Sequence, residues 1–155
     1  MSSISRNLLI ATSSAVLAWV VAAHAQTISP LKTGQLELSQ KGEVLKVPAW
    51  REGCQLMAAG PGRWMLGLVY GTPQRDENRV DVRFALGGLK GPGTYGKKNI
   101  DNLVVERDVD VWNFDPVKHD CTFTIGRLDP KGVEGSVTCA GTDIPFTSMK
   151  FVAAP

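Results

Sequence analysis

Residues 121–139 read CTFTIGRLDPKGVEGSVTC, in which two segments of alternating apolar and polar residues flank a strong turn. In the turn Asp129-Pro130-Lys131-Gly132, proline fixes one backbone dihedral and glycine accepts a positive one. On both sides of the turn apolar residues alternate with polar ones, which is the pattern of a strand with one buried face. The stretch therefore predicts an antiparallel hairpin with strands over 121–127 and 133–139.

The two cysteines that bound this hairpin set its register. If Cys121 faces Cys139, the apolar residues share one face of the hairpin and the hydroxyl residues share the other. This register pairs Phe123 with Val137, Ile125 with Gly135 and Arg127 with Val133. The second face carries Thr122, Thr124, Ser136 and Thr138. A slip of one residue would separate Phe123 and Ile125 from Val137. Directly opposed residues lie within disulfide range. We therefore predict a Cys121–Cys139 bridge and a free, buried Cys54, with Cys54–Cys139 as the alternative pairing.

Short segments of the same alternating kind recur upstream of the hairpin. They predict a hairpin over 35–47 that turns at 40–42 and ends at Pro48. A buried central strand is predicted over 64–70, and a strand over 79–86 is predicted to place Asp81 and Arg83 on a solvent-exposed (wet) face. Two more strands are predicted near 100–106 and 109–114. The intervening segments 51–62, 71–78 and 87–93 are predicted as loops, the first with room for one helical turn. This pattern predicts an all-β protein, an antiparallel β-sandwich or partly closed barrel.

Residues 1–25 have the layout of a cleavable secretory signal. Arg6 precedes an apolar run over 8–23, which closes on the small-residue sequence Ala23-His24-Ala25. We expect a signal helix over 1–25 and a single β-sandwich domain over 26–155. The run is interrupted by Thr12, Ser13 and Ser14 and falls short of the roughly 20 apolar residues of a membrane span, so a retained anchor is the less favoured alternative. The expected location is secreted or periplasmic, without stable membrane insertion after cleavage.

The charge of the chain is nearly balanced. The sequence contains 17 Lys and Arg residues and 15 Asp and Glu residues, and Arg6 is the only one of these in 1–25. This balance gives no electrostatic reason to expect nucleic acid or an anionic membrane as a partner. The three cysteines all follow the expected cleavage site, where an oxidising compartment favours pairing.

No segment carries a recognisable catalytic or metal-binding motif. His119, Asp120 and Cys121 are neighbours on a predicted strand, so their side chains point to alternate faces and cannot form a triad among themselves. One histidine and three scattered cysteines lack the ligand spacing of a zinc site. Calcium at Glu106, Asp108 and Asp110, which period-two spacing places on one strand face, is the weaker alternative to a solvated acidic row. We predict no catalytic residue, metal or cofactor.

Aromatic residues are the remaining candidates for a binding surface. If Val109 and Val111 point inward, Trp112 and Phe114 lie on the wet face of their strand and form the best candidate, with burial under a neighbouring loop as the alternative. Further binding candidates are Trp50, in an irregular segment, and Tyr95. Flat apolar rings with a polar edge suit contact with sugars or protein surfaces.

The C-terminal half resembles small exported bacterial proteins that fold as β-sandwiches, many of them lipoproteins. The resemblance rests on Gly91-Pro-Gly-Thr-Tyr, a tryptophan-bearing strand, Cys121-Thr-Phe-Thr-Ile and Val133-Glu-Gly-Ser-Val-Thr-Cys139. The chain differs from the lipoprotein members because no cysteine follows its signal. The resemblance implies export and a sandwich fold, and it transfers no functional residue.

These observations lead to three hypotheses of function. The favoured one is an exported, non-enzymatic module that binds a protein or glycan at the cell envelope through exposed aromatic residues. The second is a secreted inhibitor or effector that acts through a protruding loop over 87–98. The third is an enzyme with an unrecognised site, which would require a cleft that brings His119 together with carboxylates from distant segments.

Overall fold

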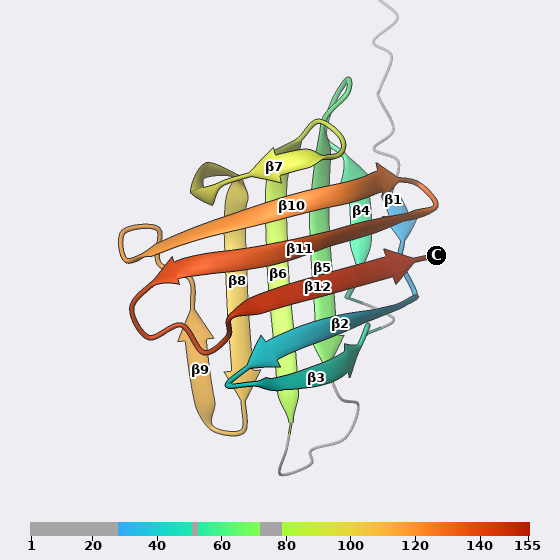
Figure 1. The fold of residues 1–155 in the computed structure, drawn as a ribbon. Helices are drawn as coiled ribbons and strands as arrows, with labels where there is room; N and C mark the ends of the chain where they lie inside the picture. Colours follow the sequence, from blue (N-terminus) through green and yellow to red (C-terminus); the bar gives the residue numbers. More distant parts are fainter. Residues whose placement is uncertain (1–27, 51–52, 72–78) are drawn as a thin grey trace, which may run out of the picture.

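A computed structural model describes residues 28–50, 53–71 and 79–155, and these residues form two six-stranded antiparallel sheets (Figure 1). Sheet A has the order β1-β4-β5-β6-β8-β9, with bounds Ile28–Pro30, Gln55–Ala58, Trp64–Gly71, Val80–Leu89, Ile100–Arg107 and Asp110–Asn113. Sheet B has the order β3-β2-β12-β11-β10-β7, with bounds Glu43–Pro48, Thr33–Gln40, Ser148–Ala154, Gly132–Gly141, His119–Asp129 and Gly93–Tyr95. A short 3₁₀ turn, η1, covers Lys97–Asn99.

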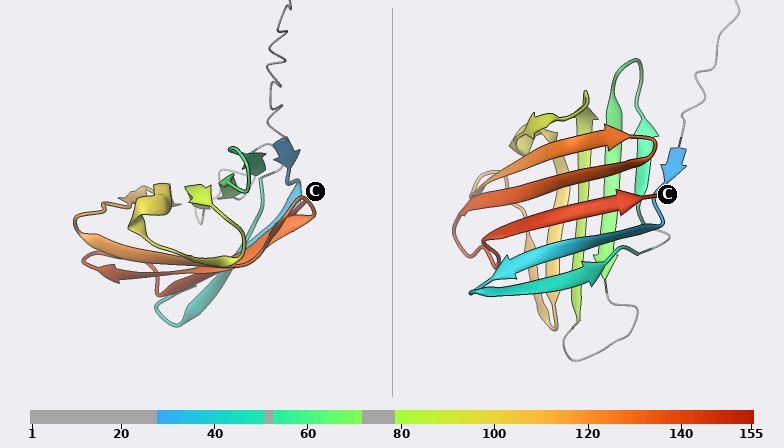
Figure 2. Two further views of the ribbon diagram at one scale, coloured as in Figure 1. Left: turned by 90° about the horizontal axis from the view of Figure 1, so that it is seen from above. Right: turned by 45° about the vertical axis from the view of Figure 1, so that its right-hand side comes forward.

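The two sheets lie in separate layers and their strands cross at a large angle, as in orthogonal sheet packing (Figures 1 and 2). The prediction of an all-β sandwich is therefore confirmed. The predicted signal helix over 1–25 lies outside the described residues.

Aromatic side chains from both sheets fill the core between the layers. The ring of Phe84 on β6 lies 5.2 Å from that of Phe123 on β10 and 4.9 Å from that of Phe151 on β12, measured between centroids. The buried Tyr70 hydroxyl on β5 donates a hydrogen bond to the Val152 carbonyl on β12 at 3.2 Å. The two layers are thus joined by apolar packing and by a direct polar contact.

The β10–β11 hairpin has the predicted turn and, over most of its length, the predicted register. Cys121 faces Cys139 with Cα atoms 4.0 Å apart and is bonded to it, and Cys54 is free and buried. The predicted pairing of Arg127 with Val133 is wrong, because an irregularity at Gly126 shifts the register after Ile125. The shift pairs Leu128 with Val133 and buries Leu128, while Arg127 stays exposed opposite Glu134.

The 35–47 hairpin is confirmed as β2 and β3, and the central strand as β5 between β4 and β6. Two predicted loops prove to contain strands. Within 51–62 the alternation of Gln55, Leu56 and Met57 is enough to form β4 against β5, with Leu56 fully buried. Within 87–93 the strand β6 continues through two glycines because Leu89 is fully buried and pairs with Trp64.

Candidate functional site

Trp112 and Phe114 do not form the exposed aromatic surface predicted for them. Both are half-buried and pack against the core, whereas Val109 and Val111 are 92% and 56% exposed. The reason is the turn between β8 and β9, where Asp108 adopts a positive φ of 54° and breaks the alternation. The Trp112 ring instead lies 4.8 Å from the His119 ring and 5.5 Å from the Phe146 ring.

The other residues with possible chemistry are also held in structural contacts. His119 is buried, and its Nδ1 accepts a hydrogen bond from the Asp115 backbone N–H at 2.9 Å. The prediction that Glu106, Asp108 and Asp110 share one strand face is wrong, since Asp108 lies in the turn between two strands. In the described part of the chain, no three His, Cys, Asp or Glu residues are grouped to hold a metal ion.

The 87–98 segment is ordered by its own hydrogen bonds. The Tyr95 hydroxyl accepts the Lys90 backbone N–H at 3.0 Å and donates to the Gly91 carbonyl at 2.5 Å. Asn99 donates its side-chain N–H to the Gly87 carbonyl at 2.9 Å. These contacts use the polar end of Tyr95 within the protein, and a packed segment of this kind counts against the inhibitory-loop hypothesis.

Trp50 is the most exposed of the predicted aromatic candidates, with 43% of the residue exposed. After β3 the chain passes to sheet A: Ala49 forms a bridge with Tyr70, and the Trp50 backbone N–H donates to the Val69 carbonyl at 2.8 Å. These bonds place Trp50 on the outer face of sheet A, beside β5 and β6. Its Cε3 atom lies 3.4 Å from the position that a Cβ at Gly71 would occupy.

Around Trp50 a concavity of about 350 Å³ opens on this outer face, which we call the Trp50 concavity. Its lining residues are Trp50, Gly53, Val69, Arg79, Asp81 and Arg83. Because alternate residues of a strand share one face, the last three project from the same side of the chain at β6. The site thus combines one aromatic ring, a small apolar floor and a row of charged side chains.

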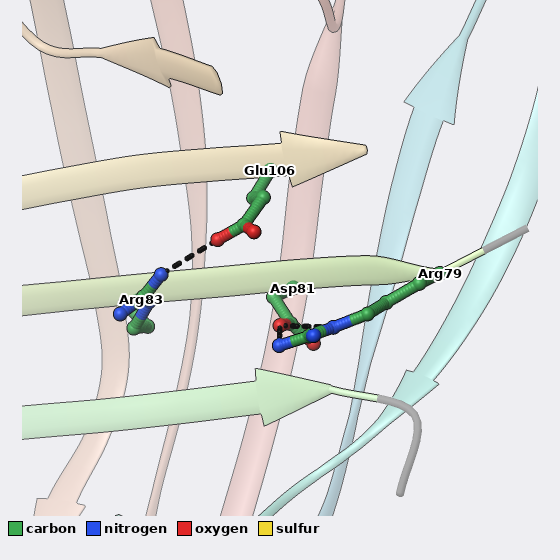
Figure 3. Close-up of polar contacts among 4 residues, drawn as sticks. All are labelled: Arg79, Asp81, Arg83 and Glu106. Carbon is green, nitrogen blue, oxygen red and sulfur yellow. Dashed lines mark hydrogen bonds and ion pairs between the residues drawn. The ribbon is translucent and has the colours of Figure 1, made fainter. Parts of the chain in front are cut away.

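Asp81 was expected on a wet face, and this expectation is wrong because the side chain is buried, with 4% of the residue exposed. Its Oδ2 accepts hydrogen bonds from Arg79 Nε, at 2.7 Å, and from Arg79 Nη2 (Figure 3). The hydrogen bond and the negative charge of Asp81 raise the pKa of Arg79 above its ordinary value. A Cβ at Gly71 would overlap Asp81 Oδ1, so glycine provides the space that this carboxylate occupies.

A second carboxylate holds the second guanidinium. Arg83 Nη2 donates to Glu106 Oε2 on the neighbouring strand β8 at 2.7 Å (Figure 3). A guanidinium has five N–H donors, and the hydrogen bonds of the described residues use only a minority of those on Arg79 and Arg83. Two arginines are therefore oriented by carboxylates, and most of their donors have no partner among the described residues.

Trp50 was predicted from the sequence, whereas the two arginines and the role of Asp81 were not. The available signal was the spacing Arg79-x-Asp81-x-Arg83, three charged residues of mixed sign on one strand face. Nothing in the sequence indicated that Trp50 lies beside them, since the crossing from β3 to sheet A brings the two segments together.

Comparison of the chain with protein-family models, with curated proteins and with solved structures gives no significant match. The resemblance to exported sandwich proteins is neither supported nor contradicted by this result. The Cys121–Cys139 disulfide fits an extracellular or periplasmic location. Over 28–50, 53–71 and 79–155, no helix has the length and apolar character needed to cross a membrane.

Proposed function

We propose that the protein is an exported, non-enzymatic binding module that holds a saccharide of the cell envelope in the Trp50 concavity. The observation that carries the proposal is the exposed Trp50 ring beside two guanidinium groups, each oriented by a carboxylate. The flat apolar face of an indole suits stacking on the C–H face of a sugar ring. The free guanidinium donors suit its hydroxyl and ring oxygens, which are acceptors.

The size of the site favours a small polar ligand over a protein surface. The Trp50 concavity is a local hollow of about 350 Å³, which is near the lower end of the volumes of small-molecule sites. Both carboxylates at the site bond arginines, which favours a role in fixing donor positions over a role in proton transfer. Because Trp112 and Phe114 pack against the core, Trp50 is the predicted aromatic candidate that supports binding at an exposed surface.

The test is saccharide binding by the exported full chain, first on an array of envelope glycans and then by calorimetry with the best ligand. Trp50→Ala removes the stacking face, and Arg83→Ala removes donors from a half-exposed side chain without unpairing the buried Asp81. Each is expected to weaken binding about ten-fold, or about 1.4 kcal/mol.

Met65→Ala is the matched control, because Met65 is 41% exposed against 43% for Trp50 and does not line the concavity. It is expected to leave the affinity unchanged. Failure of every saccharide to bind, or binding that Trp50→Ala and Arg83→Ala leave intact, would refute the proposal.

A further inference from the structure

The strands β8 and β9, the end of β2 and the segment between β11 and β12 come together at one side of the sandwich (Figure 1). Residues of these segments line a second cleft. It has a volume of about 310 Å³ and shares no residue with the Trp50 concavity. The inter-sheet contact beside it is a hydrogen bond from Arg107 Nη1 on β8 to Gln40 Oε1 on β2, at 2.5 Å. We call this hollow the end cleft.

The inner part of the end cleft is apolar. Leu38 from sheet B and Val105 from sheet A line it and are 1% and 4% exposed. Trp112 completes this part: its ring packs against the rings of His119 and Phe146, and its buried Nε1 has no hydrogen-bond partner among the described residues. The inner part of the end cleft is therefore lined by apolar side chains and by the indole of Trp112.

The outer part is charged, with a net excess of one negative charge. Asp110 and Asp143 line it and are exposed, and neither forms an ion pair within the described part of the chain. The lining cation, Arg107, donates to the neutral Gln40 amide and to neither carboxylate in the hydrogen bonds described. Two carboxylates are thus left to face a ligand.

We infer that the end cleft binds a small organic cation, an ammonium group carried on an apolar body. The apolar body occupies the space beside Leu38 and Val105, and the ammonium lies near Asp110 and Asp143. An indole ring also attracts a cation through its π face. This charge preference is opposite to that of the Trp50 concavity, which presents guanidinium donors, so the two sites recognise different ligands.

The test compares three probes with one apolar body and different charges: phenethylamine, 2-phenylethanol and 3-phenylpropionate. Calorimetry with the exported full chain at neutral pH and low salt is expected to show binding of the amine, at least about ten-fold weaker binding of the alcohol, and no binding of the carboxylate.

Variants then locate the bound amine. The double variant Asp110→Asn/Asp143→Asn is expected to weaken amine binding about ten-fold and leave the alcohol unchanged. Asparagine also tolerates the positive φ of Asp143, which is 58°. Arg107→Gln is expected to tighten amine binding several-fold, because it removes a like charge. Asp101→Asn, an exposed carboxylate at the other end of β8, is the matched control and is expected to have no effect.

Three results would overturn the inference: no heat with any probe at millimolar concentration, a carboxylate that binds as tightly as the amine, or amine binding that survives the double variant. Trp50→Ala is expected to leave amine binding unchanged, so failure here is distinguishable from failure of the saccharide proposal. Thermal unfolding of each variant establishes that it is folded before binding is compared.

Discussion

Removal of the Cys121–Cys139 bridge is expected to destabilise the domain through the unfolded state. The bridge closes a loop between residues 18 positions apart. For a loop of this length the chain-entropy model gives about 3 kcal/mol at 25 °C. At about 4 °C per kcal/mol for a domain of intermediate size, the double variant Cys121→Ala/Cys139→Ala should melt about 12 °C lower, with a further loss from the buried sulfur of Cys121.

Cys54→Ala controls for that further loss, because Cys54 is also buried but forms no cross-link. Urea unfolding separates the two effects. The double variant should show a larger m-value, since its unfolded chain is less restrained and exposes more surface, whereas Cys54→Ala should keep the wild-type slope. A double variant no less stable than Cys54→Ala, with an unchanged m-value, would show that the cross-link does not stabilise the fold by this route.

Three further changes test packing and burial. Tyr70→Phe removes the hydroxyl that bonds the Val152 carbonyl and should cost about 1 kcal/mol in urea unfolding; an unchanged midpoint would show that this contact does not join the sheets energetically. Gly135→Ala should cost at least about 2 kcal/mol because its Cβ would lie 2.6 Å from both the Phe151 ring and the Thr124 carbonyl oxygen, whereas Gly126→Ala, with its nearest contact at 3.8 Å, should cost less than about 1 kcal/mol; equal losses would contradict the packing argument. Burial raises the pKa of the Cys54 thiol, so its contribution to stability is present below the ordinary thiol pKa and is lost as the pH rises above it. Unfolding of wild type and Cys54→Ala between pH 7 and roughly pH 10 should therefore show a steeper loss in wild type, and parallel curves would contradict this effect.

The strands that sequence reasoning located best are those whose register is set by local chemistry. In the β10–β11 hairpin, the turn residues and the two cysteines act within 18 positions, so pairing through Ile125 and Gly135 was predictable. The register shift after Ile125 was not predictable from the sequence. It depends on whether the free energy gained by burying Leu128 exceeds that of keeping the regular pairing at Arg127. This balance is a property of the assembled core rather than of the local pattern.

The candidate site was less predictable because its parts meet only through tertiary structure. Alternation correctly placed Asp81 and Arg83 on the outer face, where Arg83 is exposed, but it gave no sign that Asp81 is covered there. Asp81 is buried because Trp50, from a segment that crosses between the sheets, lies next to it over Gly71. The prediction for Trp112 continued the alternation of β8 through the turn at Asp108 into β9. Because the turn breaks this alternation, Trp112 was assigned to the wrong face of the sheet.

The two candidate sites have nearly equal volumes but differ in which of their charged side chains are paired within the protein. This difference predicts that they prefer ligands of opposite charge. In the Trp50 concavity each carboxylate is bonded to an arginine, so the groups left to face a ligand are N–H donors. In the end cleft Asp110 and Asp143 form no ion pair among the described residues and outnumber the one lining cation, Arg107, so the lining keeps a net negative charge. Volume and apolar lining alone would not separate these sites. The pairing of each charge inside the protein decides which charge a ligand should carry, and exchanging the two probe classes between the sites tests that principle directly.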